Sequence, residues 1–227
     1  MNLYKKKLIV LIIFFSSCPI FANQALSSDF EKSLPELGLV DISSVDSTIQ
    51  VQLKYSDSTN FMGVDVYGDL NRCYLQKDAA IKLASASKIL KNHDKTLSLL
   101  VVDGLRPRSV QRKMWNIVKN TPMQRYVANP SFGSMHNYGC AVDVTIVDSV
   151  GNRLDMGTPM DHFGDLSQPA LNAKFLKENK LTLQQVENRE LLRQVMTSAG
   201  FHPIAIEWWH FDAFDKDFIR NTYPVIE

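Results

Sequence analysis

The sequence predicts an α+β fold in one domain, with a mainly antiparallel sheet flanked by helices. Segments with strand and helix patterns are interspersed along the chain, and it contains neither a thirty-residue repeat nor a glycine-rich phosphate loop. Its 227 residues, 45% of them hydrophobic, are enough to bury one substantial core. We therefore expect one compact domain and no second one.

Three strands and three helices can be assigned from their periodicity. Apolar and polar residues alternate over 49–53, which predicts a half-buried strand, whereas 97–102 and 141–147 are almost continuously apolar and predict strands covered on both faces. Apolar residues at helical spacing predict three helices, over 78–90, 109–118 and 188–199, and Gly200 closes the last of them.

The residues before the domain have a different character. Residues 1–22 resemble a secretory signal peptide: three lysines at 5–7 precede an apolar run of eight residues, which is too short for a membrane helix of about 20 apolar residues. We expect export, with the periplasm as the location; a lipid anchor at Cys18 is the minor alternative. Residues 23–46 predict a loosely structured lead-in, so the domain is expected to span 47–227.

Charge and cysteine content narrow the classes of partner. Removal of residues 1–22 takes away three lysines and no acid, which leaves 22 basic and 24 acidic residues and a formal charge of −2. This balance predicts no nucleic-acid partner. Cys73 and Cys140 can form a disulfide in an oxidising compartment or remain two buried thiols, and the sequence leaves both alternatives open.

The first chemically informative segment reads S-M-H-N-Y-G-C-A-V-D, from Ser134 to Asp143. Asp143 lies inside an apolar strand, and a buried carboxylate needs a cation, an arginine or a metal to balance it, unless it caps a neighbouring loop. His136 precedes a glycine that can turn the backbone. Cys140 is a chemically suitable metal ligand, but strand alternation places it opposite Asp143, so we do not expect it to bind metal.

The second segment reads E-W-W-H-F, from Glu207 to Phe211. Residues three apart on a flat strand face opposite ways, so Glu207 and His210 can serve one site only if the backbone bends or bulges between them. A core histidine is the alternative for His210 alone. Two histidines and an aspartate from separate segments, with a spare glutamate, match a catalytic zinc site of three protein ligands and one open position.

The third segment, Asp103 to Pro107, reads D-G-L-R-P. The proline disfavours a helical conformation for the residue before it, so Arg106 is held extended just after a buried strand. A fixed guanidinium suits a developing oxyanion. A surface arginine paired with Asp103 is the alternative.

Together the motifs S-x-H-x-x-G-x-A-x-D, D-G-x-R-P and E-W-W-H resemble those of the D-alanyl-D-alanine dipeptidases, which are VanX-type zinc peptidases of peptidase family M15. The likeness runs in order from about Tyr55 to Pro224. It implies one zinc ion per chain, bound by His136, Asp143 and His210. It also implies Glu207 as the catalytic acid/base and Arg106 as the support of the scissile carbonyl oxygen. The residues that it assigns to the two ends of the dipeptide are Tyr55, Ser134 and Asp161.

The resemblance implies zinc-dependent hydrolysis of D-Ala-D-Ala to two D-alanines in a small cleft, in peptidoglycan dipeptide turnover or glycopeptide resistance. The expected partner is a small D-amino-acid dipeptide, with no permanent membrane span. One alternative is a D,D-carboxypeptidase or another peptidoglycan peptidase that shares the first motif. A non-catalytic zinc-binding module is a further alternative, but a glutamate that is not a ligand, Glu207, argues against it.

Overall fold

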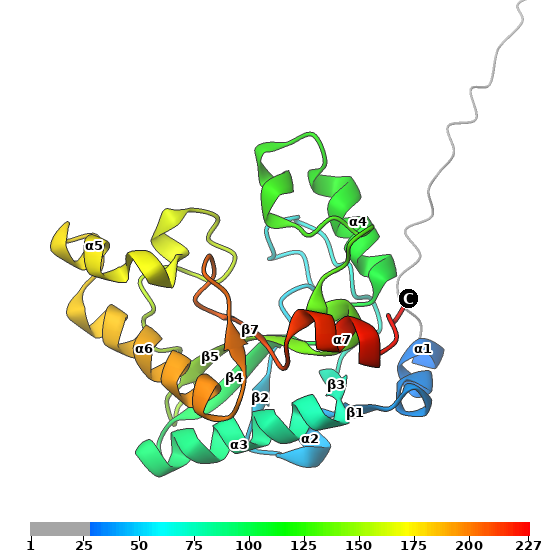
Figure 1. The fold of residues 1–227 in the computed structure, drawn as a ribbon, viewed down its shortest axis with the longest axis horizontal. Coiled ribbons are helices and arrows are strands. Elements are labelled where there is room, and N and C mark those ends of the chain that lie inside the picture. The colour runs from blue at the N-terminus through cyan, green and yellow to red at the C-terminus, as the bar shows by residue number, and fades with distance from the viewer. Residues whose placement is uncertain (1–27) are drawn as a thin grey trace, which may run out of the picture.

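A five-stranded mixed sheet forms the centre of the computed structural model, which describes residues 28–227 (Figure 1). Its strands lie in the order β2-β4-β5-β7-β6; β2 is parallel to β4, and the other neighbouring pairs are antiparallel. A second, two-stranded antiparallel sheet joins β1 and β3. The prediction of a single α+β domain with a mainly antiparallel sheet is confirmed. The strands are β1 (Leu39–Asp41), β2 (Gln50–Val51), β3 (Tyr74–Gln76), β4 (Ser98–Asp103), β5 (Ala141–Val147), β6 (His202–Pro203) and β7 (His210–Asp212).

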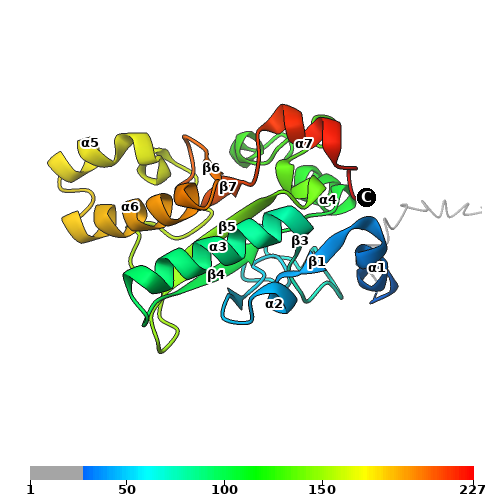
Figure 2. The ribbon, with the colours of Figure 1, turned by 60° about the horizontal axis from the view of Figure 1, so that its bottom comes forward.

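Helices flank this sheet. The longest, α3 and α6, pack against each other and lie along the same side of the sheet in both ribbon views (Figures 1 and 2). The α-helices are α1 (Ser28–Ser33), α2 (Ile42–Val45), α3 (Lys77–His93), α4 (Arg108–Val118), α5 (Asn172–Lys177), α6 (Leu183–Ser198) and α7 (Lys216–Thr222). The 3₁₀ helices are η1 (Leu34–Leu37), η2 (Pro122–Tyr126), η3 (Met135–Tyr138), η4 (Asp165–Ser167) and η5 (Pro169–Leu171).

The long predicted elements are present, with shifted ends. Strand β5 has the predicted bounds, and β4 is displaced by one residue. Helix α6 begins five residues before its predicted start, because Thr182 and Gln185 form a capping box: each side chain accepts a hydrogen bond from the backbone N–H of the other. The strand predicted over 49–53 is reduced to β2, although single hydrogen bonds to β4 continue beyond it.

The prediction of a loosely structured lead-in over 23–46 is wrong for its described part. Residues 28–46 contain α1, η1, β1 and α2. Leu34, Leu39 and Ile42 are at most 1% exposed and belong to the main core. The scattered apolar residues of this segment thus anchor it to the domain, because their burial in the core stabilises the packed segment. The expected signal peptide and Cys18 lie outside the described residues.

Residues of three neighbouring strands, β4, β5 and β7, form one row at the same end of the sheet. Asp103, at the end of β4, is the register partner of Asp143 on β5, and Asp143 is in turn the partner of His210 on β7. A register shift between Val101 and Asp103 marks a β-bulge at the end of β4. Bulges commonly re-aim side chains beside functional sites. This end of the sheet therefore gathers residues from all three predicted motifs.

Candidate metal centre and active site

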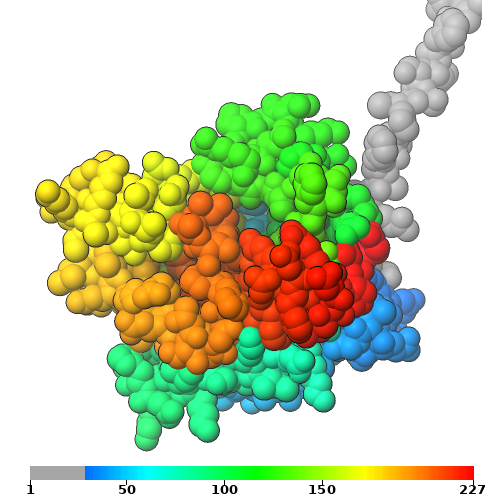
Figure 3. All heavy atoms as spheres, viewed as in Figure 1, coloured from blue at the N-terminus to red at the C-terminus, as the bar shows by residue number. Residues whose placement is uncertain are grey.

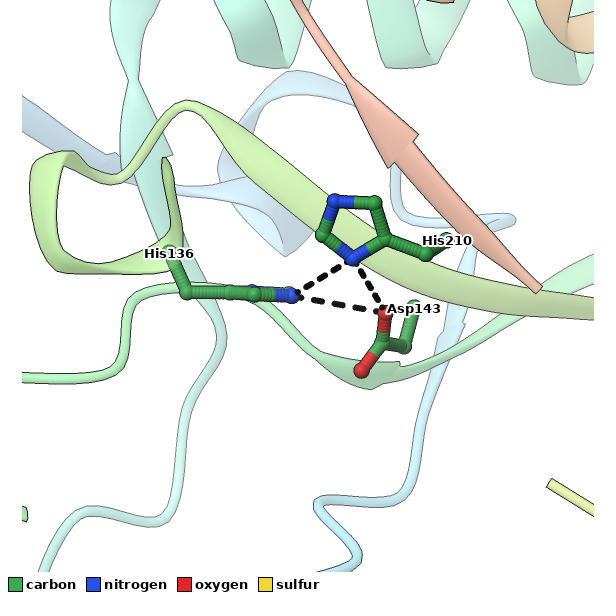
Figure 4. Close-up of side chains that lie close together, drawn as sticks. All are labelled: His136, Asp143 and His210. Carbon is green, nitrogen blue, oxygen red and sulfur yellow. Dashed lines mark hydrogen bonds and ion pairs between the residues drawn. The ribbon is translucent and has the colours of Figure 1, made fainter. Parts of the chain in front are cut away.

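His136, Asp143 and His210 meet at this end of the sheet (Figure 4). Asp143 and His210 face each other across β5 and β7, and His136 lies on η3, the short helix before β5. Gly139 ends this helix with a φ of 66°, and a Cβ atom there would lie 2.5 Å from Cδ2 of Leu39. Glycine is therefore required where the chain turns from η3 into β5.

The three side chains point at one another and are buried (Figure 4). Nε2 of His136 lies 3.2 Å from Nδ1 of His210 and 3.3 Å from Oδ1 of Asp143. Nδ1 of His210 lies 3.0 Å from the same carboxylate oxygen. Within residues 28–227, this is the only group of three or more His, Cys, Asp or Glu side chains close enough to hold a metal ion.

Both histidine rings are fixed by a hydrogen bond on the outer nitrogen. Nδ1 of His136 lies 2.7 Å from the carbonyl oxygen of Gly104, and Nε2 of His210 lies 2.9 Å from Oδ1 of Asp212. A carbonyl oxygen only accepts, so Nδ1 of His136 carries a proton, and the Asp212 carboxylate favours a proton on Nε2 of His210. Such partners are typical around metal-binding histidines, because they aim the unprotonated nitrogen at the metal.

The electrostatics of the cluster call for positive charge. Burial by itself raises the pKa of Asp143, but the hydrogen bonds and charges of His136 and His210 hold it well below its usual range. Burial by itself lowers the pKa of His210, but Asp143 and Asp212 raise it to about 10. A proton on the imidazole or a metal cation can supply the charge, and metal binding displaces the proton.

Arg106 lies beside the cluster and is held by Asp103. The carboxylate of Asp103 accepts hydrogen bonds from Nε of Arg106 at 3.0 Å, from its Nη2, and from the hydroxyl group of Tyr67. Nη1 of Arg106 donates to Oε1 of Gln111 at 3.2 Å. The pairing with Asp103 that the sequence left open is therefore real, but Arg106 is only 8% exposed and is not a surface arginine.

Glu207 lines the same cavity as His210. The backbone bends at residues 208–209, and β7 begins only at His210. The predicted departure from a flat strand is thus confirmed. Burial is the largest cause that raises the pKa of Glu207, to about 7. A half-buried carboxyl group that exchanges a proton near neutral pH, and that the ligand cluster does not use, is suited to acid–base chemistry.

The three residues expected at the ends of a dipeptide also line this cavity. The hydroxyl group of Tyr55 donates to Oδ1 of Asp161 at 2.9 Å. Oδ2 of Asp161 is buried and has no hydrogen-bond partner, and burial together with Asp143 raises the pKa of Asp161 to about 6. Ser134 is the N-cap residue of η3 and accepts a long hydrogen bond, 3.4 Å, from the backbone of His136.

The cavity that contains these residues has a volume of about 270 Å³. The molecular surface is hollowed between the orange segment before β7, the red helix α7 and the green region that includes η2 (Figure 3). An aromatic wall lines part of the cavity: Phe163 stacks on Tyr126 with 4.5 Å between ring centroids and makes an edge contact with Phe61 at 4.9 Å. The three side chains that could hold a metal ion and Glu207 therefore share one small space with the groups expected to hold a substrate.

The structure also answers the cysteine questions. Cys73 and Cys140 are buried free thiols, so the disulfide alternative is not realised. Cys140 packs in the small apolar cluster with Met135, Tyr138 and Ile219 and is not part of the metal-binding group, as strand alternation predicted. Sequence reasoning did not identify Asp212 or Gly104 as partners of the histidines. The aspartate two residues after His210, on the same strand face, was the available signal for the first.

Comparison with known proteins identifies the family. A family model described as D-Ala-D-Ala dipeptidase matches residues 35–226. The D-alanyl-D-alanine dipeptidase of Escherichia coli (strain K12) is 33% identical over 174 residues, which are 77% of this chain and 83% of the relative. The D-alanyl-D-alanine dipeptidase of Enterococcus faecium is 28% identical over 208 residues, 83% of this chain and 96% of the relative. The chain belongs to the D-Ala-D-Ala dipeptidase family of M15 peptidases.

Membership of this family makes the chain a metallopeptidase. The buried His-Asp-His group and the adjacent glutamate agree with that class, because they provide a possible metal site and a carboxyl group beside it. Among the described residues, 28–227, no helix is both long and apolar enough to span a membrane.

Proposed function

We propose that the chain is a zinc dipeptidase that hydrolyses D-Ala-D-Ala to two D-alanines. The observation that carries the proposal is the convergence of three ligand atoms in the cavity that also contains Glu207. Zinc bound tetrahedrally at about 2.0–2.2 Å places its ligand atoms about 3.3–3.5 Å apart. The distances of 3.0, 3.2 and 3.3 Å among His136, Asp143 and His210 fit this requirement within a few tenths of an ångström.

The proposed reaction adds water across the peptide bond. Zinc, when bound to His136, Asp143 and His210, supplies a Lewis acid that lowers the pKa of water to about 7 and polarises the carbonyl group. Glu207 takes the proton from the attacking water as the new C–O bond forms. It then gives this proton to the leaving nitrogen as the C–N bond breaks, so one side chain serves as base and then as acid.

Arg106 is proposed to stabilise the oxyanion. Its guanidinium group is fixed by Asp103 and Gln111 before any substrate arrives, so little reorganisation is needed when negative charge develops. Burial by itself lowers the pKa of Arg106, but neighbouring anionic groups, Asp103 first among them, raise it well above its ordinary value. The arginine therefore stays charged throughout the reaction.

The ends of the dipeptide are proposed to be held by Tyr55, Ser134 and Asp161. The unpartnered Oδ2 of Asp161 is a natural acceptor for the substrate ammonium group, because a buried carboxylate oxygen without a partner is costly and a charged donor relieves the cost. Tyr55 fixes the orientation of this carboxylate through its hydrogen bond to Oδ1. The aromatic wall and the small volume of the cavity favour a short substrate.

Metal analysis of the purified protein combined with peptide assays tests this function. We expect about one zinc ion per chain, hydrolysis of D-Ala-D-Ala, and no hydrolysis of L-Ala-L-Ala or of a pentapeptide that ends in D-Ala-D-Ala. Cleavage of the pentapeptide in preference to the free dipeptide would instead identify a D,D-carboxypeptidase. A metal-loaded protein that cleaves no D-amino-acid peptide would identify a binding module.

The setting of the reaction is also a proposal. The N-terminal signal pattern supports export to the periplasm, where the enzyme would degrade dipeptide released from the cell wall, because the cytoplasmic precursor pool is out of its reach. Cell fractionation tests this location. Recovery of the protein in the cytoplasm would favour a role in glycopeptide resistance. Recovery of the parent protein with the membrane, and loss of this membrane fraction in a Cys18→Ala variant, would establish the lipid anchor.

A further inference from the structure

Two cationic side chains of α7 reach the cavity without a role in the chemistry described above. Lys216 and Arg220 both line the cavity, and they are four residues apart on α7, so they share one face of this helix. Figure 3 shows α7 in red at the edge of the hollow. The helix packs against η3, whose N-cap residue is Ser134, and Ser134 lines the same cavity as the two cations.

A series of contacts separates these cations from Asp161. Asp161 binds Tyr55, and the ring of Tyr55 lies 5.2 Å from the guanidinium carbon of Arg106. Nη2 of Arg106 is 3.8 Å from Asp143, whose other oxygen is bonded to His210. Asp212 accepts from His210 and lies 3.8 Å from Nζ of Lys216. In this series of contacts the proposed metal ligands Asp143 and His210 stand between Asp161 and Lys216.

The donors of both cations remain available to a ligand. Nζ of Lys216 lies 3.8 Å from Oδ2 of Asp212. Nη1 of Arg220 lies 3.8 Å from Oδ1 of Asp217, whose side chain is 88% exposed. Neither distance is that of a hydrogen bond. The exposed Arg220–Asp217 pair contributes little, and Lys216 lies near the buried Asp212 carboxylate without a hydrogen bond to it. The side chains of Lys216 and Arg220 are 55% and 43% exposed, so they can turn toward a group at the cavity mouth.

A zwitterionic dipeptide carries an ammonium group at one end and a carboxylate at the other. If Asp161 receives the ammonium group, the carboxylate must point toward the other end of the cavity, past the metal ligands. Asp143, Glu207 and Asp212 line the same cavity, and a substrate carboxylate that shares it with them needs positive charge close by. Lysine and arginine are the side chains that bind carboxylates with charge-assisted hydrogen bonds.

We propose that Lys216 and Arg220 are specificity-determining residues that bind the free C-terminal carboxylate of the dipeptide substrate. This assignment rests on the proposed dipeptidase function and deepens it. The pair fixes the direction of the substrate and requires that the residue after the scissile bond be the last one. An internal peptide bond has no carboxylate at that distance, so a longer peptide placed there lacks this charge-assisted contact and binds more weakly.

Binding and turnover are measured separately to test this proposal. Isothermal titration calorimetry on a Glu207→Gln background gives Kd for D-Ala-D-Ala and for its C-terminal amide without hydrolysis. The same titrations are made after Lys216→Gln and Arg220→Gln together, after Arg220→Lys, and after the control Arg193→Gln. Arg193 is a fair control because its side chain is 46% exposed, is paired with Glu190, and does not line this cavity.

We expect the double substitution to raise Kd for the acid by about tenfold or more, as for a lost charge-assisted contact, and to leave Kd for the amide unchanged. Arg220→Lys and Arg193→Gln should bind the acid nearly as well as the parent does. Equal binding of acid and amide by the parent, no change on double substitution, or an equal loss for both ligands would overturn the proposal. Hydrolysis of D-Ala-D-Ala by the unsubstituted holoenzyme is scored independently, so a protein that binds the acid through α7 without cleaving it contradicts the dipeptidase function alone.

Discussion

Two aspartates of the same cavity, the buried Asp143 and the half-buried Asp161, have opposite environments. Asp143 lies on a paired central strand, and two histidines hold its pKa well below the usual range. Asp161 lies in a loop with a left-handed φ of 61°, has one oxygen without a partner, and has a pKa raised to about 6, mainly by burial. The negative charge of Asp143 is compensated by the two histidines. Asp161 keeps one carboxylate oxygen that is available to a ligand.

This contrast distinguishes the proposed metal-binding part of the site from its proposed substrate-binding part. The proposed ligands stand on strands and a capped 3₁₀ helix, with outer hydrogen bonds that fix their orientation. The proposed substrate end that contains Asp161 is built from loops, where irregular backbone can follow the shape of a ligand. Environments that push the pKa values of like groups apart assign them different roles. Substitutions can therefore damage one function while the other is kept.

The largest effect is expected from Glu207→Gln, which should spare both aspartates. The amide keeps the size of the side chain but cannot accept a proton from water, so kcat should fall about 10²- to 10⁴-fold. The zinc content and the affinity for D-Ala-D-Ala should remain near those of the parent, since neither proposed ligand nor end-binding residue is changed. Metal analysis, calorimetry and steady-state kinetics measure these quantities. A variant with near-parental kcat would remove Glu207 from the proposed mechanism.

A smaller effect is expected on the metal side from Asp212→Asn. This substitution weakens the hydrogen bond that orients His210 and favours a proton on its outer nitrogen, so zinc affinity or activity should fall about 10- to 100-fold. Competition with a metal-sensitive chelator gives the affinity. Asp217→Asn, an exposed change on α7, is the control and should bind zinc as the parent does. Equal affinities for all three proteins would mean that Asp212 does not support the metal.

The two sides of the site also differ in how far the sequence could predict them. Asp143 was identified because the charge of an aspartate buried in an apolar strand must be compensated. His136 lies in the same segment, and His210 adds a second histidine in an aromatic segment. Their convergence depends on the register of β5 and β7, which pairs residues 67 positions apart and is not readable from local periodicity. The family resemblance supplied that long-range information for the site residues.

For the fold, periodicity identified the long elements and missed the short ones. Helices α3 and α6 repeat an apolar face over several turns, whereas α7 has seven residues and a pattern too brief to recognise. The parallel pairing of β2 with β4 was not predicted either, because two residues of strand carry little signal. The polar composition of the lead-in led to the wrong prediction for this segment. Burial of only three side chains, Leu34, Leu39 and Ile42, is enough to hold it against the core.

A pH dependence should distinguish the substrate side from the metal side. Asp161 must be ionised to bind an ammonium group, and its raised pKa of about 6 means that it is protonated below that pH. In a Glu207→Gln protein, affinity for D-Ala-D-Ala should be full above pH 7 and fall as pH decreases through about 6, approaching tenfold per unit below it. Calorimetry between pH 5 and pH 8 measures this. A second substitution, Asp161→Asn, should give weak binding that does not vary with pH over this range; an unchanged slope would assign the titration to another group.

The smallest effect on turnover is expected from Arg189→Lys, which tests what holds the Asp161 loop in place. Arg189 on α6 is buried and donates to the carbonyl oxygens of Met156 and Leu166 and to Oδ1 of Asn172, so it ties both ends of the segment that contains Asp161. Lysine carries the same charge but lacks the planar fork. We expect the free energy of unfolding to fall by about 1–3 kcal/mol and KM to rise several-fold, with kcat nearly unchanged because the strands that hold the proposed ligands are untouched. Urea denaturation and steady-state kinetics measure both, and Arg193→Lys, an exposed change on the same helix, should alter neither. A fall in stability with an unchanged KM would mean that Arg189 supports the fold without positioning Asp161, and a parallel fall in kcat would mean that the two sides of the site are not separable.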